Sequence, residues 1–142
     1  MTNTDQAVNV SQAIYDILFL NKQELGIEDV WDGDEQLIGK YPSLCVIQGE
    51  KTRELTGAPF RTDNNFNVFV MVYHGAVRDS QLNYRDANTL AERVEALLHQ
   101  DKTLGGIVVH GFVVSIEPGV VDRGTLQYVS RLTWRGLTKT LT

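Results

Sequence analysis

The chain has 142 residues, of which 42% are hydrophobic and 22% are charged, and this is enough length for one globular domain with its own core. The formal net charge of −5 argues against broad binding of nucleic acid, which depends on neutralising phosphates with lysine and arginine. Because Cys45 is the only cysteine, an intrachain disulfide is excluded, and its apolar neighbours predict a small core residue.

The sequence carries no targeting or domain-dividing signal. Its N-terminus lacks a basic segment followed by an apolar run, so no signal peptide is expected. No stretch approaches the ~18 consecutive apolar residues of a membrane span. With no repeat and no linker, residues 1–142 are predicted to form a single domain folded in a cytosol.

The first predicted element is a helix over about Asp5–Leu20, where apolar residues recur at helical spacing. The segment Asn21–Pro42 is predicted to be mostly loop, with a short strand near Ile27–Trp31. Its centre, Glu28–Glu35, is strongly acidic but departs from the calcium-loop pattern, so a solvated loop is favoured. Trp31 stands alone in this loop and is a candidate contact residue, since tryptophan is enriched at binding hot spots.

Next, the sequence predicts a long β-hairpin. Its strands, Leu44–Glu50 and Phe66–His74, are joined by the polar segment Lys51–Asn65. The second strand alternates between two faces, with valines on one and larger or polar residues on the other. The connection is longer than a tight turn requires, and it carries charges around a Gly57-Ala58-Pro59 break. We therefore expect a charged tip that contacts a neighbouring subunit or partner through Lys51, Arg53, Glu54, Arg61 and Asp63.

The second half predicts a helix from Gln81 or Asn83 to Gln100 and two strands, Ile107–Glu117 and Leu126–Gly136, with a turn at Pro118-Gly119. Trp134, on the apolar face of the last strand, is predicted to be core. The order helix, strand, strand, helix, strand, strand predicts an α+β fold. Its sheet would be mainly antiparallel, with about four strands and helices packed on one face.

No pattern in the chain is typical of an active site. His74, His99 and His110 are well separated, belong to no metal-ligand spacing and are predicted to be structural. Cys45 lies within a strand, and there is neither a nucleophile elbow nor a phosphate-binding loop. We therefore predict no catalytic residue, no cofactor and no metal, and we do not expect an enzyme.

One run resembles a known family. Asn88–Gly106 contains a helix ending in Leu97-Leu98, then Asp101 and the sequence Thr103-Leu104-Gly105-Gly106. Together with Tyr41-Pro42-Ser43 before a strand and the closing Leu132–Gly136, it resembles the tail terminator (tail completion) proteins of tailed bacteriophages. The resemblance covers most of the chain in order and length.

This resemblance implies a homohexameric ring that caps the phage tail tube, ends its polymerisation and joins the tail to the head connector. The implied partners are further copies of the chain, the tail tube protein and the head–tail connector or neck protein. Genomic DNA would pass through the lumen without specific binding, and no membrane is involved. The protein would be made in the host bacterial cytoplasm and end in the virion.

Two alternatives stay open. A head-side neck or stopper (head completion) protein would be favoured by a long loop that plugs the channel. A cytosolic small-molecule-binding or enzymatic α+β domain would be favoured by a pocket with convergent polar groups.

Overall fold

The computed structural model describes residues 6–33, 42–55, 61–76, 80–122 and 126–141. The described elements are, in chain order, α1 (Gln6–Leu20), α2 (Lys22–Leu25), β1 (Asp29–Asp32), β2 (Ser43–Leu55), β3 (Arg61–Ala76), α3 (Ser80–Leu98), β4 (His110–Asp122) and β5 (Leu126–Leu141). No helix of this part of the chain is long and apolar enough to cross a membrane.

The strands form one mixed sheet in the order β1-β2-β3-β5-β4. The neighbours β2–β3, β3–β5 and β5–β4 are antiparallel, whereas β1 pairs in parallel with Ser43–Val46 of β2. The predicted α+β class is confirmed. The predicted count of about four strands is too low, because the short strand expected near Ile27–Trp31 joins the sheet as β1, preceded by the unpredicted α2. Part of the predicted acidic loop is therefore strand.

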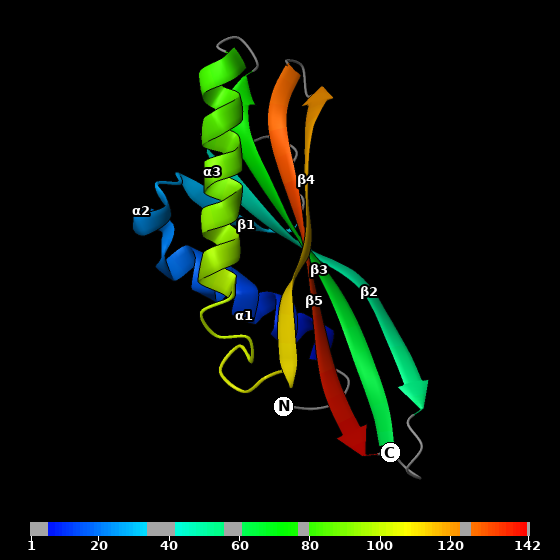
Figure 1. Ribbon diagram of the computed structural model, residues 1–142. Coiled ribbons are helices and arrows are strands. Elements are labelled where there is room, and N and C mark those ends of the chain that lie inside the picture. Colours follow the sequence, from blue (N-terminus) through cyan, green and yellow to red (C-terminus); the bar gives the residue numbers. More distant parts are fainter. Residues whose placement is uncertain (1–5, 34–41, 56–60, 77–79, 123–125, 142) are drawn as a thin grey trace.

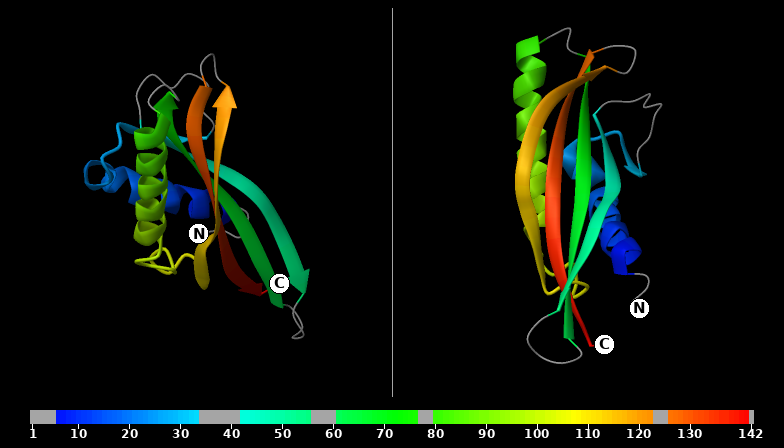
Figure 2. Two further views of the ribbon diagram at one scale, coloured as in Figure 1. Left: turned by 45° about the horizontal axis from the view of Figure 1, so that its top comes forward. Right: turned by 90° about the vertical axis from the view of Figure 1, so that its right-hand side faces the viewer.

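The two long helices pack on one face of the sheet, as the right-hand view of Figure 2 shows, in which the sheet's other face is turned toward the reader. The stripes of α1 and α3 meet the valine face of β3 in one core. Its completely buried members include Val10, Ile14, Leu18, Ala91, Val94, Val70, Val72, Leu132 and Trp134. The alternation predicted for β3 is thus confirmed.

The predicted loop over Lys51–Asn65 is wrong, because most of it is strand. β2 continues to Leu55 and β3 begins at Arg61, and their ladder runs from the pair Lys51–Phe66 to the pair Leu55–Thr62. β5 also extends beyond its predicted end, pairing Gly136–Leu141 with the same part of β3. The Gly57-Ala58-Pro59 break lies outside the described residues.

We call residues 49–55, 61–66 and 136–141 the arm. Figure 1 shows β2, β3 and β5 reaching past the helices at the lower right. A register shift between Gln48 and Lys51 marks the point where β2 enters the arm. The arm's strands are held by backbone pairing on both sides of β3, so the polar sequence needs no apolar alternation to remain a strand.

The predicted turn at Pro118-Gly119 is also wrong. Both residues lie within β4, opposite Ser130 and Val129 of β5. Because β4 is the last strand of the sheet, the missing amide of a proline need not interrupt a ladder on its outer side. β4 begins later than predicted, at His110, because the residues before it form a turn.

That turn contains the residues that carry the family resemblance. The Asp101 carboxylate accepts hydrogen bonds from the Thr103 hydroxyl at 2.7 Å, the Thr103 amide at 3.0 Å and the Gly105 amide at 2.8 Å. Leu104 has a left-handed backbone (φ 51°), and its side chain is buried in the core. The turn therefore fastens the end of α3 to the sheet.

Trp134 lies against two glycines that face each other across β4 and β5. Gly111 pairs with Gly136 in the ladder, and the Trp134 ring is completely buried beside them. A Cβ atom on Gly111 would lie 1.9 Å from Trp134 Cζ2, and one on Gly136 would lie 2.2 Å from Cη2. Only glycine fits at either position while the indole remains in place. The predicted core role of Trp134 is confirmed.

We expect Gly111→Ala to destabilise the fold by about 1–3 kcal/mol or more, because the added methyl group overlaps a ring that cannot move within a packed core. The cost should fall in a Trp134→Phe background, since phenylalanine lacks the outer ring atoms. Urea unfolding measures both effects. Gly119→Ala, on the same strand with open space around its Cβ, is the matched control and should change stability little; equal effects at the two glycines would contradict this account.

Hydrogen bonds from the Thr103 hydroxyl, the Gly105 amide and the Thr103 amide hold the pKa of Asp101 below its ordinary value of 3.8. A carboxyl whose pKa is lowered on folding adds stability above its unfolded pKa, and this contribution is lost as the pH falls through the folded pKa. Asp101→Asn should therefore have a lower free energy of unfolding than the parent at pH 7. This difference should disappear in strong acid. Urea unfolding at several pH values, with Glu92→Gln as the charge control, measures it; a gap independent of pH would contradict the assignment.

Candidate functional site

The predicted contact residues are brought together in part. Lys51, Arg53 and Glu54 lie on β2, and Arg61 and Asp63 lie on the facing part of β3, so all five belong to the arm. The side chain of Arg61 is outside the described part of the structure.

Trp31 lies apart from these five residues. It is in β1, opposite Cys45, and packs half-buried against the small cluster of Cys45, Tyr73 and Val129. This cluster lies on the sheet face opposite the helices. The indole of Trp31 therefore contributes to packing there, and the predicted burial of Cys45 is confirmed.

In the ladder of the arm, Lys51 and Arg53 lie on one face, and Glu54 and Asp63 lie on the other. In the β2–β3 register Lys51 faces Phe66, and its Nζ lies 5.2 Å from the centre of the Phe66 ring. Burial and then the charge of Arg53 lower the pKa of Lys51. Glu54 is directly opposite Asp63 on the other face of the ladder, and adjacent like charges disfavour such a pair. On its other side Asp63 is opposite Lys139 of β5 in the register, so this face of the arm carries charges of both signs.

The sheet has two unlike free edges. One is the full length of β4, the last strand in the sheet order. The other is the outer side of Ile47–Leu55, because β1 pairs only with Ser43–Val46 and no other described strand lies there. Unpaired strand edges are templates for pairing with another chain. One molecule thus presents two different strand edges on opposite sides.

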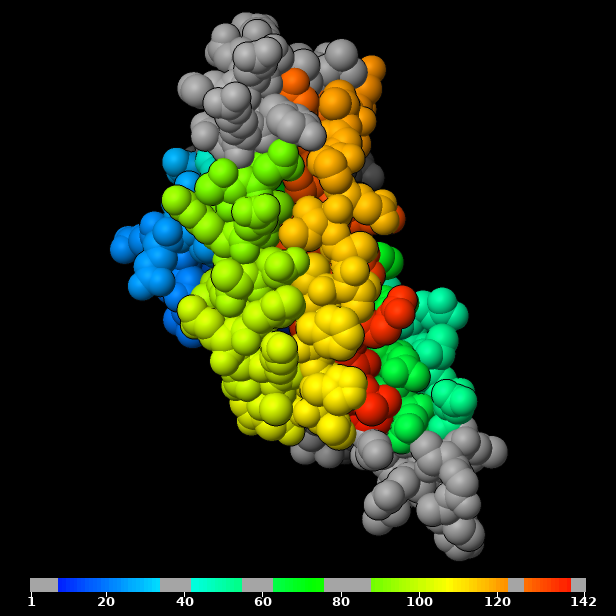
Figure 3. Space-filling model, viewed as in Figure 1, coloured from blue at the N-terminus to red at the C-terminus, as the bar shows by residue number. Residues whose placement is uncertain are grey.

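β4 carries an unusual share of exposed apolar side chains. Phe112 is 44% exposed, Val114 38% and Val120 51%, and Val109 lies just before the strand. Figure 3 shows β4 in yellow to orange along the surface beside α3. Exposed apolar residues on an edge strand are typical of a contact surface or an aggregation hazard. Pro118 and a register shift between Val113 and Ser115 limit pairing along the strand.

His99 holds this edge strand in place. The Val113 amide, at the register shift, donates a 2.9 Å hydrogen bond to His99 Nε2 at the end of α3. His99 Nε2 therefore serves as the acceptor for an amide of the edge strand next to the irregularity. His99 thus has the structural role that was predicted for it.

The sheet face away from the helices carries two arginines on β5. Arg131 forms a 2.8 Å ion pair with Glu117 and lies 5.3 Å from the centre of the Phe69 ring. Arg135 donates to Asn67 at 3.1 Å. The alternating sequence of β5 indicates this polar face. The partners of the two arginines lie on other strands, so the sequence of β5 alone does not predict them.

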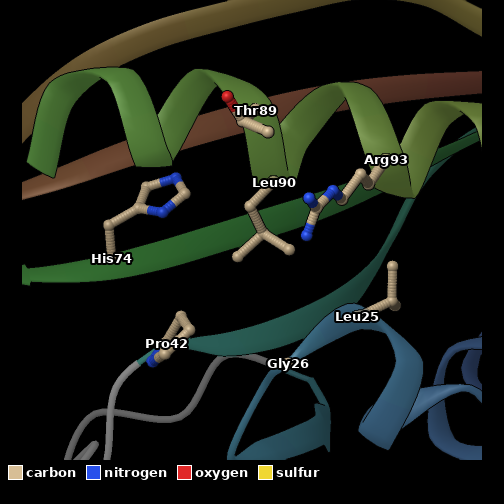
Figure 4. A pocket seen from close by; sticks show the side chains of 7 residues that line it. All are labelled: Leu25, Gly26, Pro42, His74, Thr89, Leu90 and Arg93. Atoms are coloured by element: carbon tan, nitrogen blue, oxygen red, sulfur yellow. The ribbon is translucent and has the colours of Figure 1, made fainter.

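A pocket of about 400 Å³ lies between α3, the α2–β1 turn and the adjoining ends of β2 and β3. Figure 4 shows His74 and Arg93 reaching into it on either side of Leu90, with Pro42 and Leu25 on the opposite wall. Sequence reasoning missed this pocket, because its walls come from four separate segments.

Within the described ranges, no group of three or more His, Cys, Asp or Glu side chains could hold a metal ion. No protein-family model matches the sequence, and no curated protein matches it.

We expect His99→Ala to destabilise the protein by about 1–3 kcal/mol, because it leaves the partly buried Val113 amide without this acceptor. Hydrogen exchange at Val113 and its β4 neighbours should accelerate, and urea unfolding should report the loss. Gln100→Ala, at the exposed neighbouring position, is the control. Unchanged exchange at Val113 would show that the hydrogen bond does not hold the strand.

Proposed function

We propose that the protein is a structural component of a phage tail: a terminator whose copies close into a ring on the tail tube, end its polymerisation and join it to the head connector. The observation that carries the proposal is the pair of unlike free edges on one sheet, together with the exposed apolar side chains of β4. The resemblance of Asn88–Gly106 to tail terminator proteins supplies the biological setting.

A ring requires a heterologous contact, in which one surface of each subunit meets a different surface of the next. The outer edge of β4 and the outer edge of Ile47–Leu55 are two such surfaces. The nine residues of Ile47–Leu55 extend for roughly 30 Å, and they would pair with the stretches of β4 that the register shift and Pro118 leave regular. Pairing there would satisfy backbone groups and cover Phe112 and Val114, which are exposed in the single chain.

The arm adds charge to this contact. Glu54 and Asp63 face each other, and Asp63 Oδ1 is buried without a hydrogen-bond partner among the described residues. Lys139 of β5 is opposite Asp63 in the same sheet, and a cationic group from a neighbouring copy or from the tube protein would add a partner for Glu54. Lys51, Arg53 and Arg61 lie in the same arm and are the corresponding cations.

The acidic net charge supports free passage of DNA through the ring. A formal charge of −5 on each copy opposes adhesion to phosphates. On the sheet face away from the helices, Arg131 is paired with Glu117, and Arg135 donates to Asn67. A bore lined mainly by lysine and arginine would contradict this part of the proposal.

A small-molecule-binding domain is the second candidate, because the pocket beside α3 brings a guanidinium, an imidazole and an apolar wall together. A head-side stopper remains an alternative of the first class, since it would use the same edges in a ring.

The test is assembly. The purified protein, alone and mixed with tail tube protein, should give ring particles in negative-stain images, and tubes of fixed length should carry a cap. Phe112→Asp should abolish rings and capping, because it removes an exposed apolar ring from the subunit contact and places a charge there, beside Arg135 on the neighbouring strand. Light scattering should then report single subunits.

Leu20→Asp is the matched control, since Leu20 is an exposed apolar residue (82%) that ends α1 and belongs to neither edge strand. Rings should survive this change. Equal loss of rings in both variants, or rings that persist in Phe112→Asp, would show that β4 is not the contact. Tubes that grow without limit in the presence of the parent protein would overturn the terminator role.

A further inference from the structure

We propose that the pocket between α3 and the α2–β1 turn binds a small organic anion, with its carboxylate or phosphate group on Arg93 and its apolar part against Leu25, Pro42 and Leu90. This inference is independent of ring formation. It rests on which groups converge in the pocket and on how its walls are fixed.

The polar groups in the pocket favour an anion. Arg93 is an exposed residue of α3 and His74 a half-buried residue near the end of β3, and both side chains reach into the space shown in Figure 4. No carboxylate is among the described residues that line the pocket. A guanidinium presents paired N–H donors that match the two oxygens of a carboxylate or phosphate, and the imidazole ring of His74 lies on the other side of Leu90.

The remaining wall favours a ligand with an apolar body. Leu25 and Leu90 are buried residues of the core whose side chains also border the pocket, and Pro42 lies beside them. A volume of about 400 Å³ is within the range of small-molecule sites. An inorganic ion alone would leave most of this space and the apolar wall unused. A carboxylate or phosphate on a ring or short chain would occupy both.

The walls are fixed in the structure before any ligand binds. Gly26 ends α2 with a left-handed backbone (φ 71°), and its amide is held by Gln23 and Lys22. The Glu28 amide then donates to the Pro42 carbonyl at 2.8 Å, which ties the α2–β1 turn to the start of β2. A Cβ on Gly26 would meet no atom within 4 Å, so the space beside the turn is open. A preformed site loses less entropy on binding.

The probe is benzoate, which combines a carboxylate with a compact apolar ring. Equilibrium dialysis of labelled benzoate against the full chain is expected to show saturable binding in the millimolar range or tighter. Benzamide, which has the same shape without the charge, should bind far more weakly. Arg93→Gln should weaken benzoate binding on the order of tenfold or more, the loss expected for a charge-assisted hydrogen bond. Arg93→Lys keeps the charge without the paired donors, and its affinity for benzoate should lie between those of the parent and Arg93→Gln.

Lys102→Gln removes the same charge from an exposed position beyond α3 and should bind benzoate as the parent does. Circular dichroism of each variant checks that the fold is kept. Four results would overturn the proposal: no saturable binding, equal binding of benzamide, undiminished binding by Arg93→Gln, or an equal loss in Lys102→Gln. None of these depends on whether the protein assembles into rings, so this proposal and the terminator role can fail separately.

Discussion

The contact on which the rest of the structure depends is that of the Trp134 ring with the paired glycines of β4 and β5. Gly136 faces Gly111 on one side and Phe66 on the other, so this level of the sheet joins three strands. On one side of it the helices cover the sheet, and on the other the arm begins. The indole fills the space in which Cβ atoms on Gly111 and Gly136 would lie. β4 can therefore pack close to the core although it is the outermost strand of the sheet.

The molecule therefore has two parts. The helix-covered part of the sheet is stabilised by its own core, and the arm is suited to contact with another molecule. The arm has backbone pairing on both sides of β3 but no helix above it, and its side chains include the facing acids Glu54 and Asp63. Groups of this kind add little stability to an isolated chain. The placement of these charged side chains in the arm is explained if another molecule packs against them.

The parts of the fold that sequence predicted correctly are those where a face is buried. The valines of β3 and the stripe of α3 showed the periods of a strand and a helix because one side of each meets the core. The strand ends were mispredicted where burial stops, as in the arm and at Pro118. β1 was only partly predicted, since its place in the sheet depends on parallel pairing with β2.

The candidate sites were less predictable than the fold. The five charged arm residues were proposed as contact residues because they are close together in sequence. The pocket was not, since Gly26, Pro42, His74 and Arg93 give no local pattern. The turn at Asp101 was noticed as a resemblance, and the structure supplies its physical basis in three hydrogen bonds to one carboxylate.

The register shift in β4 has a geometric consequence for any assembly through that edge. An irregularity of this kind increases the local twist of a strand, and His99 fixes it by accepting from the Val113 amide. The twist of the edge strand would set the angle by which each copy is rotated from the last. Copies added at a constant angle close into a circle only when the rotation is right, and otherwise they continue as an open spiral. A single histidine at the end of α3 would therefore help to decide between a closed and an endless assembly.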